Sequence, residues 1–275
     1  MSDHLDGTGT AERTATTVRY DLTDGVATVT LDRAESMNSL DTATKVALRD
    51  AVLEAASDDA VRCVLLTGTG RAFCVGQDLR EHVGQLAAKD QALWQTVDEH
   101  YVPIATALGT MPKPVVAGVN GVAAGAGAAF AMAADVRVLA ASGGFNLAFA
   151  GIALSADSGA TWWLPRLVGV ARAKELLLMP RTIKAEEALA LGLVTEVVPD
   201  EQLADRAREV AHRLAAGPTV AYGALRRAVA FSASHPLEES LANESRLMTL
   251  TGETADHAEA VAAFLEKRSP SFTGR

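Results

Sequence analysis

The sequence is poor in cysteine, in aromatic side chains and in net positive charge, and each shortage excludes a class of protein. The two cysteines, Cys63 and Cys74, are too few for a disulfide framework and suit a reducing compartment. Aromatic residues make up only 5% of the 275 residues, so the core must consist mainly of alanine, valine and leucine. Lysine and arginine number 25 against 34 aspartates and glutamates, and this net charge of −9 argues against a nucleic-acid partner.

The sequence also predicts neither a secretion signal nor a membrane span. Residues 1–16 are polar and acidic, without the apolar run of a signal peptide, and are predicted to form a disordered tail. Residues 114–134 carry no charge, but they are mainly glycine and alanine, include Asn120 and begin with a proline. We therefore predict a strand, a turn and a tightly packed helix there, in a cytoplasmic protein with no membrane partner.

Buried strands alternate with helices over the first two thirds of the chain. Apolar residues alternate on both sides of the pair Asp24–Gly25, which predicts a hairpin. A helix with Asp41 as its N-cap follows. Nearly continuous apolar runs at 61–67, 114–119 and 136–140 indicate strands that are covered on both faces. This order predicts an α/β fold with right-handed crossovers.

The last third is predicted to be almost entirely helical. Beyond Ala171 only residues 193–198 favour an extended segment, and a final helix is expected over 254–267. We place a domain boundary near residue 200, which gives a core over 17–200 and a C-terminal helical domain over 201–275. Such a domain could mediate oligomerisation, act as a lid or simply cover the core.

Familiar catalytic motifs are missing. The sequence contains no His-Glu-x-x-His, no Gly-x-Ser-x-Gly, no Walker loop and no cysteine pair at zinc spacing, so we predict no metal site. Its six histidines are scattered. Only His82 and His100, which flank a loop-rich region, are placed where they could touch a ligand.

Two glycine-rich loops, 68–79 and 120–129, each follow a predicted buried strand. Glycine at such a corner lets backbone N–H groups face a ligand, and two corners together could form an oxyanion hole. Alternatively, the glycines only permit tight turns and close helix packing. A dinucleotide site in the second loop is disfavoured, because Phe130 stands where the third glycine belongs and no acidic residue follows about 20 positions later.

Asp157 is the acidic residue of greatest interest. It precedes an apolar helix that contains Trp162 and Trp163, and an aspartate there is commonly a helix N-cap. If its side chain instead faces an apolar pocket, desolvation raises its pKa and makes it a better base. The residues alone leave both interpretations open.

Three motifs, at 71–79, 120–129 and 164–169, resemble those of the enoyl-CoA hydratase/isomerase (crotonase) superfamily in order and spacing, and the likeness runs from Val18 to Phe272. The resemblance implies a crotonase-like spiral of ββα turns with a C-terminal helical oligomerisation domain, assembled as a homotrimer or a dimer of trimers. It implies an acyl-CoA thioester as the substrate and no cofactor besides the coenzyme A that the substrate carries. It also implies that the backbone N–H groups of Gln77 and Ala126 bind the thioester oxygen.

The resemblance further implies where coenzyme A binds. The residues expected to contact it or the acyl group, the last two in the site of a neighbouring subunit, are Arg33, Ser36, Met37, Ala72, Asp78, Leu79, Phe264 and Lys267. For Arg33 and Lys267, an ordinary solvated charge is the alternative interpretation.

The two glutamates with which hydratases of this family activate and protonate water are absent. Ala129 occupies the motif position of the first, and a gap-free alignment places Phe149 at the second. The segment around Asp157 resembles instead the family's ring-epoxide isomerases of phenylacetate breakdown, although Ser155 and Ala156 replace the apolar residue and proline usual there.

We therefore predict an acyl-CoA isomerase in which Asp157 is the single acid/base. Its substrate would be a ring-epoxide phenylacetyl-CoA or an enoyl-CoA whose double bond migrates. An enoyl-CoA hydratase with another acid, drawn from residues 81–101, and a non-catalytic CoA-ester-binding protein remain alternatives. Trp94, Trp162 and Trp163 could line the acyl pocket, although tryptophans more often pack in the core.

Overall fold

The computed structural model describes residues 16–275, so the predicted tail over 1–16 lies, apart from Thr16, outside the described residues. The strands are β1 (Val18–Thr23), β2 (Val26–Leu31), β3 (Cys63–Gly68), β4 (Ala72–Cys74), β5 (Val115–Val119), β6 (Val122–Ala124), β7 (Val136–Ala140), β8 (Gly144–Asn146), β9 (Thr182–Lys184) and β10 (Glu196–Val198). The α-helices are α1 (Thr42–Ser57), α2 (Leu79–Ala88), α3 (Ala92–Thr96), α4 (Val102–Thr110), α5 (Ala126–Ala133), α6 (Ala160–Val168), α7 (Val170–Leu178), α8 (Ala185–Ala190), α9 (Leu203–Ala215), α10 (Thr219–Ser232), α11 (Leu237–Gly252) and α12 (Ala255–Glu266). The other helical turns are η1 (Ala34–Ser36), η2 (Val97–Tyr101, a π-helix), η3 (Ala150–Ile152) and η4 (Asp200–Gln202).

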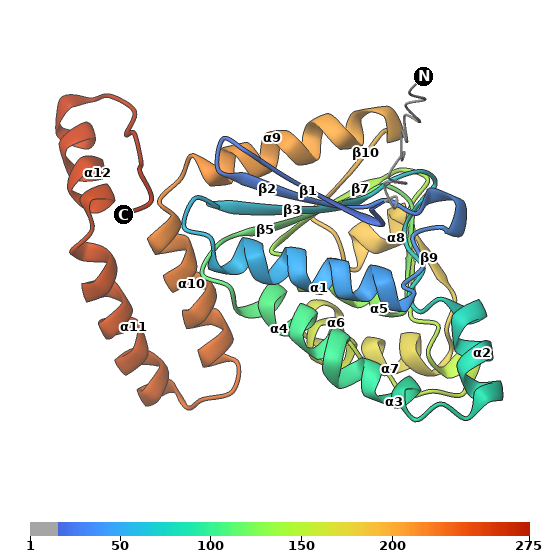
Figure 1. The fold of residues 1–275 in the computed structure, drawn as a ribbon. Coiled ribbons are helices and arrows are strands. Elements are labelled where there is room, and N and C mark those ends of the chain that lie inside the picture. The colour runs from blue at the N-terminus through green and yellow to red at the C-terminus, as the bar shows by residue number, and fades with distance from the viewer. Residues whose placement is uncertain (1–15) are drawn as a thin grey trace, which may run out of the picture.

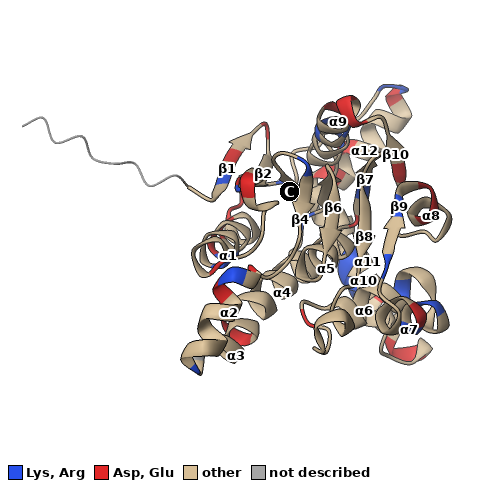
Figure 2. Ribbon diagram, turned by 90° about the vertical axis from the view of Figure 1, so that its right-hand side faces the viewer, with Lys and Arg blue, Asp and Glu red and all other residues tan. Residues whose placement is uncertain are grey.

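The strands form two sheets, and the chain visits them in alternation. The larger sheet has the order β1-β2-β3-β5-β7-β10 and is parallel except for the hairpin β1–β2. The smaller sheet has the order β4-β6-β8-β9, and Figure 2 shows these short strands side by side. Each of β3, β5 and β7 in the larger sheet is followed at once by β4, β6 or β8 in the smaller. One or more helices complete each turn, which is the predicted spiral of ββα turns.

The central strands are buried on both faces, which explains their nearly continuous apolar runs. One face of the larger sheet packs against α9, and the other packs against α1, α4 and α5 (Figure 1). In β3, Cys63 and Leu65 face α9, whereas Val64 and Leu66 face the other layer. Because side chains alternate along a strand, burial of both faces requires an apolar residue at every position.

The prediction for the last third was incomplete. Besides the expected extended segment, which the structure narrows to β10, it contains β9, which pairs antiparallel with β8. Three residues are too few to show a period of two, so β9 gave no signal in the sequence. Its place depends on the tertiary contact of Ile183 with Phe145 across the ladder.

The C-terminal helices differ in how they contact the rest of the fold. Helix α9 lies beyond residue 200, yet Leu203, Ala207 and Val210 are buried against the larger sheet. Helices α10, α11 and α12 stand to one side of the sheets (Figure 1). The boundary at residue 200 stays a prediction, and α9, which lies beyond it, packs on the core sheet.

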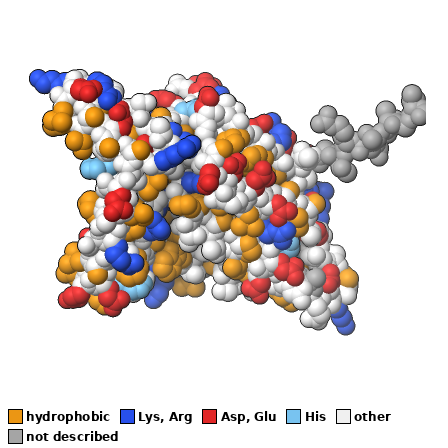
Figure 3. Space-filling view, turned by 60° about the vertical axis from the view of Figure 1, so that its left-hand side comes forward, with side chains coloured by type: hydrophobic (Ala, Val, Ile, Leu, Met, Phe, Trp, Pro, Cys, Tyr) orange, Lys and Arg blue, Asp and Glu red, His pale blue; other side chains and the backbone are white. Residues whose placement is uncertain are grey.

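Large apolar side chains are exposed along these three helices. Figure 3 brings this side of the molecule forward and shows them spread over its surface. Those at least 40% exposed are Leu225, Val229, Leu237, Leu241, Met248, Leu250, Val261, Phe264 and Leu265. An apolar surface of this extent is typical of an interaction face.

Residues 114–134 contain the predicted strand, β5, and the predicted helix, α5, every residue of which is buried. The structure adds a second short strand, β6, which was not predicted. Within residues 16–275, no helix is long and apolar enough to cross a lipid bilayer.

Candidate active site

The two glycine-rich loops meet at the ends of β4 and β6. Gly76 has a φ of +82°, and Gly125 has a φ of +51° directly before α5. A Cβ atom on Gly76 would lie 3.0 Å from the carbonyl oxygen of Ala124 and 3.3 Å from the amide nitrogen of Ala126. The glycines therefore serve both interpretations, because they permit the turns and also bring the two loops into contact.

This contact leaves two backbone donors without a partner. Neither the N–H of Gln77 nor that of Ala126 donates a hydrogen bond within the described residues. Their neighbours are engaged, since the N–H of Asp78 donates to the carbonyl of Leu40 and that of Gly125 donates to the carbonyl of Asn146. Two free donors on facing loops are the geometry that an oxyanion hole requires.

A cavity of about 120 Å³ opens between these loops. It is lined by Val75, Gly76, Gln77, Leu79, Tyr101, Gly125, Ala126, Ala148, Phe149, Ile152, Leu154 and Asp157. The fold thus brings together the predicted base, Asp157, and both predicted oxyanion donors, Gln77 and Ala126, from three separate segments. The assigned roles stay predictions.

Asp157 does not cap a helix, so the N-cap interpretation is wrong. Helix α6 begins after Gly159 without a side-chain cap, and the Asp157 carboxylate accepts a hydrogen bond from Ser158 Oγ at 2.9 Å. Burial raises the pKa of Asp157, although the Ser158 hydroxyl acts in the opposite direction. A carboxylate with a raised pKa in a largely apolar cavity is suited to proton transfer.

The cavity has no second carboxylate among the described residues that line it. Ala129 is buried inside α5, and Phe149 lines the cavity with its ring. These are the positions at which the resemblance puts the two glutamates of the hydratases, and neither side chain transfers protons.

Sequence reasoning missed a polar group behind the first loop. Gln77 Oε1 accepts hydrogen bonds from the Tyr101 hydroxyl at 2.5 Å and from Lys45 Nζ at 3.3 Å. Burial raises the pKa of Tyr101, and burial lowers the pKa of Lys45. The signal for Lys45 was its spacing, since it shares the apolar face of α1 with Leu48 and Val52.

A second hollow adjoins the cavity, sharing Val75, Gln77 and Leu79 with it. It is lined by Arg33, Glu35, Ser36, Met37, Ser39, Asp41, Arg71, Val75, Gln77, Asp78, Leu79, Arg80 and Glu81. Five of the residues predicted to bind coenzyme A lie here, namely Arg33, Ser36, Met37, Asp78 and Leu79. Arg71 and Arg80, which were not predicted to bind it, add two exposed cations.

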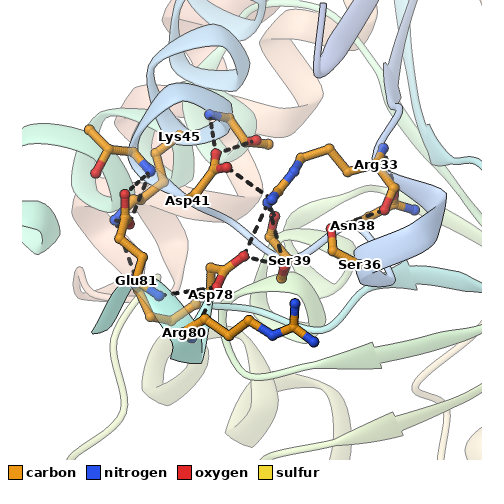
Figure 4. A network of polar contacts seen from close by, with 12 residues as sticks. Arg33, Ser36, Asn38, Ser39, Asp41, Lys45, Asp78, Arg80 and Glu81 are labelled. Atoms are coloured by element: carbon orange, nitrogen blue, oxygen red, sulfur yellow. Dashed lines mark hydrogen bonds and ion pairs between the residues drawn. The ribbon is translucent and has the colours of Figure 1, made fainter. Parts of the chain in front are cut away.

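Arg33 is not an ordinary solvated charge. Its guanidinium forms ion pairs with Asp41 at 3.0 Å and with Asp78 at 3.3 Å, and Figure 4 shows it between the two carboxylates. Asp78 also accepts from Ser39 Oγ at 2.8 Å and from the N–H groups that begin α2. Burial acts to raise the pKa of Asp78, but these hydrogen bonds outweigh it, so the pKa is lowered.

The remaining predicted coenzyme A contacts are not brought to this hollow. Ala72 is fully buried, and its carbonyl accepts hydrogen bonds from the side chains of Asn38 and Asn120. Phe264 is 82% exposed on α12, and Lys267 ends that helix in a left-handed conformation. The contact predicted for Ala72 uses its backbone, and the contacts predicted for Phe264 and Lys267 lie in a neighbouring subunit. All three stay predictions.

None of the three tryptophans lines the Asp157 cavity. Trp162 and Trp163 line a different, largely apolar cavity between α6 and α10. Trp94 is 56% exposed and meets the ring of His82 edge to face. His100 is buried and contacts Thr96 Oγ1 at 3.2 Å, outside the residues that line the Asp157 cavity.

Comparisons with known proteins agree in family but differ in named activity. The family model described as enoyl-CoA hydratase/isomerase matches residues 21–275. A "Probable enoyl-CoA hydratase" of Rhodobacter capsulatus is 47% identical, over 94% of this chain and 98% of the relative. The 1,2-epoxyphenylacetyl-CoA isomerase of Escherichia coli is 41% identical, over 91% and 96% respectively. The crystal structure of enoyl-CoA hydratase from Bacillus anthracis is 32% identical with a TM-score of 0.85, covering 94% of this chain and 100% of that chain.

Proposed function

Because this chain belongs to the enoyl-CoA hydratase/isomerase family, we propose that it isomerises acyl-CoA thioesters with Asp157 as its single acid/base. The observation that carries the proposal is the composition of the cavity, in which Asp157 is the only carboxylate among the described lining residues. One carboxylate suffices for isomerisation, because the proton it removes can be returned at another carbon. Addition of water requires a group that activates the water and a group that protonates the substrate.

The reaction begins with the thioester oxygen between the N–H groups of Gln77 and Ala126. Asp157 removes a proton from the carbon next to the carbonyl, and the two donors stabilise the negative charge that develops on the oxygen. Removal of one such donor typically costs about 3 kcal/mol of transition-state stabilisation. Ala126 is the first residue of α5, so the partial positive charge of the helix N-terminus adds to the effect. Asp157 then delivers its proton further along the acyl group.

Two acyl groups fit this chemistry. A ring-epoxide phenylacetyl group is our first candidate, because a relative at 41% identity is named 1,2-epoxyphenylacetyl-CoA isomerase. The apolar side chains of Phe149, Ile152 and Leu154 in the cavity suit an aromatic ring. An aliphatic enoyl group whose double bond migrates is the second candidate, since the trans-2-decenoyl-[acyl-carrier-protein] isomerase of Streptococcus mutans is 34% identical.

We assign the adjoining hollow to the coenzyme A portion of the substrate. Arg71 and Arg80 line it with exposed guanidinium groups, which suit the phosphates of coenzyme A. Arg33 also lines it, with its guanidinium paired to Asp41 and Asp78. The coenzyme arrives as part of the substrate, so the proposed chemistry uses no metal and no further cofactor.

We further propose that the protein is a homotrimer or a dimer of trimers in the cytoplasm. The exposed apolar side chains of α10, α11 and α12 supply the contact surface. In this assembly Phe264 and Lys267 of α12 reach the active site of a neighbouring subunit. Two buried free thiols, Cys63 and Cys74, suit a reducing compartment.

Enoyl-CoA hydratase activity is the second candidate, and one specific observation favours it. The Tyr101 hydroxyl belongs to the predicted region 81–101 and lines the same cavity as Asp157, so it could serve as the missing second proton-transfer group. The relative at 47% identity also carries a hydratase name.

The deciding experiment follows a 3-enoyl-CoA and crotonyl-CoA in deuterated water with the wild-type protein and with Asp157→Asn. We expect double-bond migration or deuterium incorporation in the wild type, and its loss in the variant while binding of the CoA ester persists. Hydration of crotonyl-CoA that survives in Asp157→Asn would contradict the isomerase proposal. Binding without turnover in both proteins would indicate a non-catalytic CoA-ester-binding protein. If double-bond migration occurs, the ring-epoxide thioester is tested next.

A further inference from the structure

Lys45 is a lysine buried in the interior directly behind the first oxyanion loop. Its side chain is 1% exposed, and its ammonium donates to Thr96 Oγ1 at 2.9 Å and to Gln77 Oε1 at 3.3 Å. The nearest carboxylate, that of Glu81, lies at 3.7 Å (Figure 4). Burying an ammonium is costly unless its contacts compensate, so a lysine at this position calls for a physical explanation.

The contacts of Lys45 fix one particular side chain. An ammonium group can only donate hydrogen bonds, so the Gln77 atom that faces it must be the amide oxygen. The Tyr101 hydroxyl donates to the same oxygen at 2.5 Å. Two donors on one acceptor hold the Gln77 side chain in a single orientation, and Gln77 is also the residue whose free backbone N–H faces the cavity.

We propose that Lys45 is a positioning residue for the oxyanion hole. Through its contact with the side chain of Gln77, it fixes the orientation of the backbone N–H that binds the thioester oxygen. This inference rests on the proposed function, since it assumes that Gln77 is an oxyanion donor. Preorganised donors and charges in a water-poor site stabilise developing negative charge without reorganisation during the reaction.

The chain offers a matched control in a second buried lysine. Lys113 is 5% exposed, and its ammonium donates to the backbone carbonyls of Ala55 and Asp58. Both acceptors lie at the C-terminal end of α1, whereas Lys45 lies in its first turn. Lys113 lines neither the Asp157 cavity nor the adjoining hollow. Replacing either lysine by methionine removes one buried ammonium and keeps most of the side-chain volume.

The direct measurement is the carbonyl stretching frequency of a bound, unreactive thioester. We would record difference infrared spectra of butyryl-CoA, labelled with carbon-13 at the carbonyl, on the wild type, Lys45→Met and Lys113→Met. We expect the wild type and Lys113→Met to lower the frequency equally, and Lys45→Met to lower it less. In steady-state assays, we expect kcat of Lys45→Met to fall about ten- to a hundredfold with a smaller change in KM. For Lys113→Met, we expect kcat to be unchanged.

A double-mutant cycle tests whether Lys45 acts through Gln77. Gln77→Met keeps the backbone N–H and removes only the side-chain amide, so Lys45→Met in that background should cause little further loss of kcat. Equal carbonyl frequencies in the wild type and Lys45→Met, or fully additive losses, would overturn the inference. A wild type that binds butyryl-CoA without any frequency shift would instead refute the oxyanion hole and with it the proposed function.

Discussion

Asp157 and Tyr101 line one cavity, and the charge of Asp157 acts on the Tyr101 phenol. Burial raises the pKa of the Tyr101 phenol, and the negative charge of Asp157 raises it further. The phenol is therefore protonated at neutral pH, and Tyr101 acts there as a hydrogen-bond donor. Its proton is directed to Gln77 Oε1, so the cavity contains one group ready to accept a proton and one that is neutral.

Turnover should fall on the acid side of the pH profile. The proposed base must be ionised, and burial raises the pKa of Asp157, so the acid limb of kcat should lie above the ordinary aspartate value. Ser158→Ala removes a hydroxyl that lowers this pKa, and we expect the limb to move to higher pH. The pH dependence of kcat in both proteins checks this. An acid limb that does not move would show that the limb belongs to another group.

The same shift has a consequence for stability. Because the pKa of Asp157 is higher in the folded protein than in the unfolded chain, the folded state binds the proton more tightly. The contribution of Asp157 to stability is therefore most favourable below the unfolded pKa and declines as pH rises through the folded pKa. We therefore expect Asp157→Asn to have a larger free energy of unfolding than the wild type at pH 7, measured by urea denaturation. A less stable variant would contradict burial as the cause of the raised pKa.

Tyr101→Phe separates the isomerase from the hydratase. If Asp157 is the only acid/base, the variant loses a hydrogen bond to Gln77 but keeps its proton-transfer group. We expect kcat for double-bond migration to fall by less than about tenfold. If Tyr101 is instead the second proton-transfer group of a hydratase, hydration of crotonyl-CoA should fall by about a hundredfold or more. Parallel assays of the two reactions distinguish these outcomes.

Gly127→Ala should disrupt the contact between the two loops. A Cβ atom at Gly127 would lie 2.2 Å from the carbonyl oxygen of Cys74, a backbone atom that cannot move away cheaply. We expect a loss of about 2 kcal/mol or more in the free energy of unfolding, together with reduced turnover. Gly84→Ala is the matched control, because Gly84 lies in α2 with no atom within 4 Å of the added Cβ. Urea denaturation should show that control unchanged or stabilised by up to about 1 kcal/mol.

Val229→Asp should weaken the assembly. Val229 is 73% exposed on α10, within the apolar surface that we assign to contacts between subunits. A buried, unpaired carboxylate is costly, so we expect smaller particles in sedimentation velocity experiments. Leu53→Asp, on α1 and 42% exposed, should leave the sedimentation coefficient unchanged. A wild type that sediments as a monomer would refute the proposed trimer.

Local elements were predictable because they depend on neighbouring residues. Asp41 caps α1 through the N–H of Thr44, and β7 spans the predicted residues 136–140. Thr254 and Lys267 are the two caps of α12, as the predicted limits of 254–267 suggest. In each case, a capping side chain or an apolar run within a few residues determines the structure.

By itself, the sequence determined the α/β order, the two glycine corners and the absence of the hydratase glutamates, because short-range chemistry and motif spacing encode them. Only the tertiary structure decided whether Asp157 caps a helix or lines a cavity, because the local sequence around it is compatible with both. It also placed Lys45 behind Gln77, although the two are 32 positions apart in the chain. The helical spacing of Lys45 indicates that it faces the core. It does not indicate that Gln77 lies opposite, because that contact follows from how the ββα turns stack.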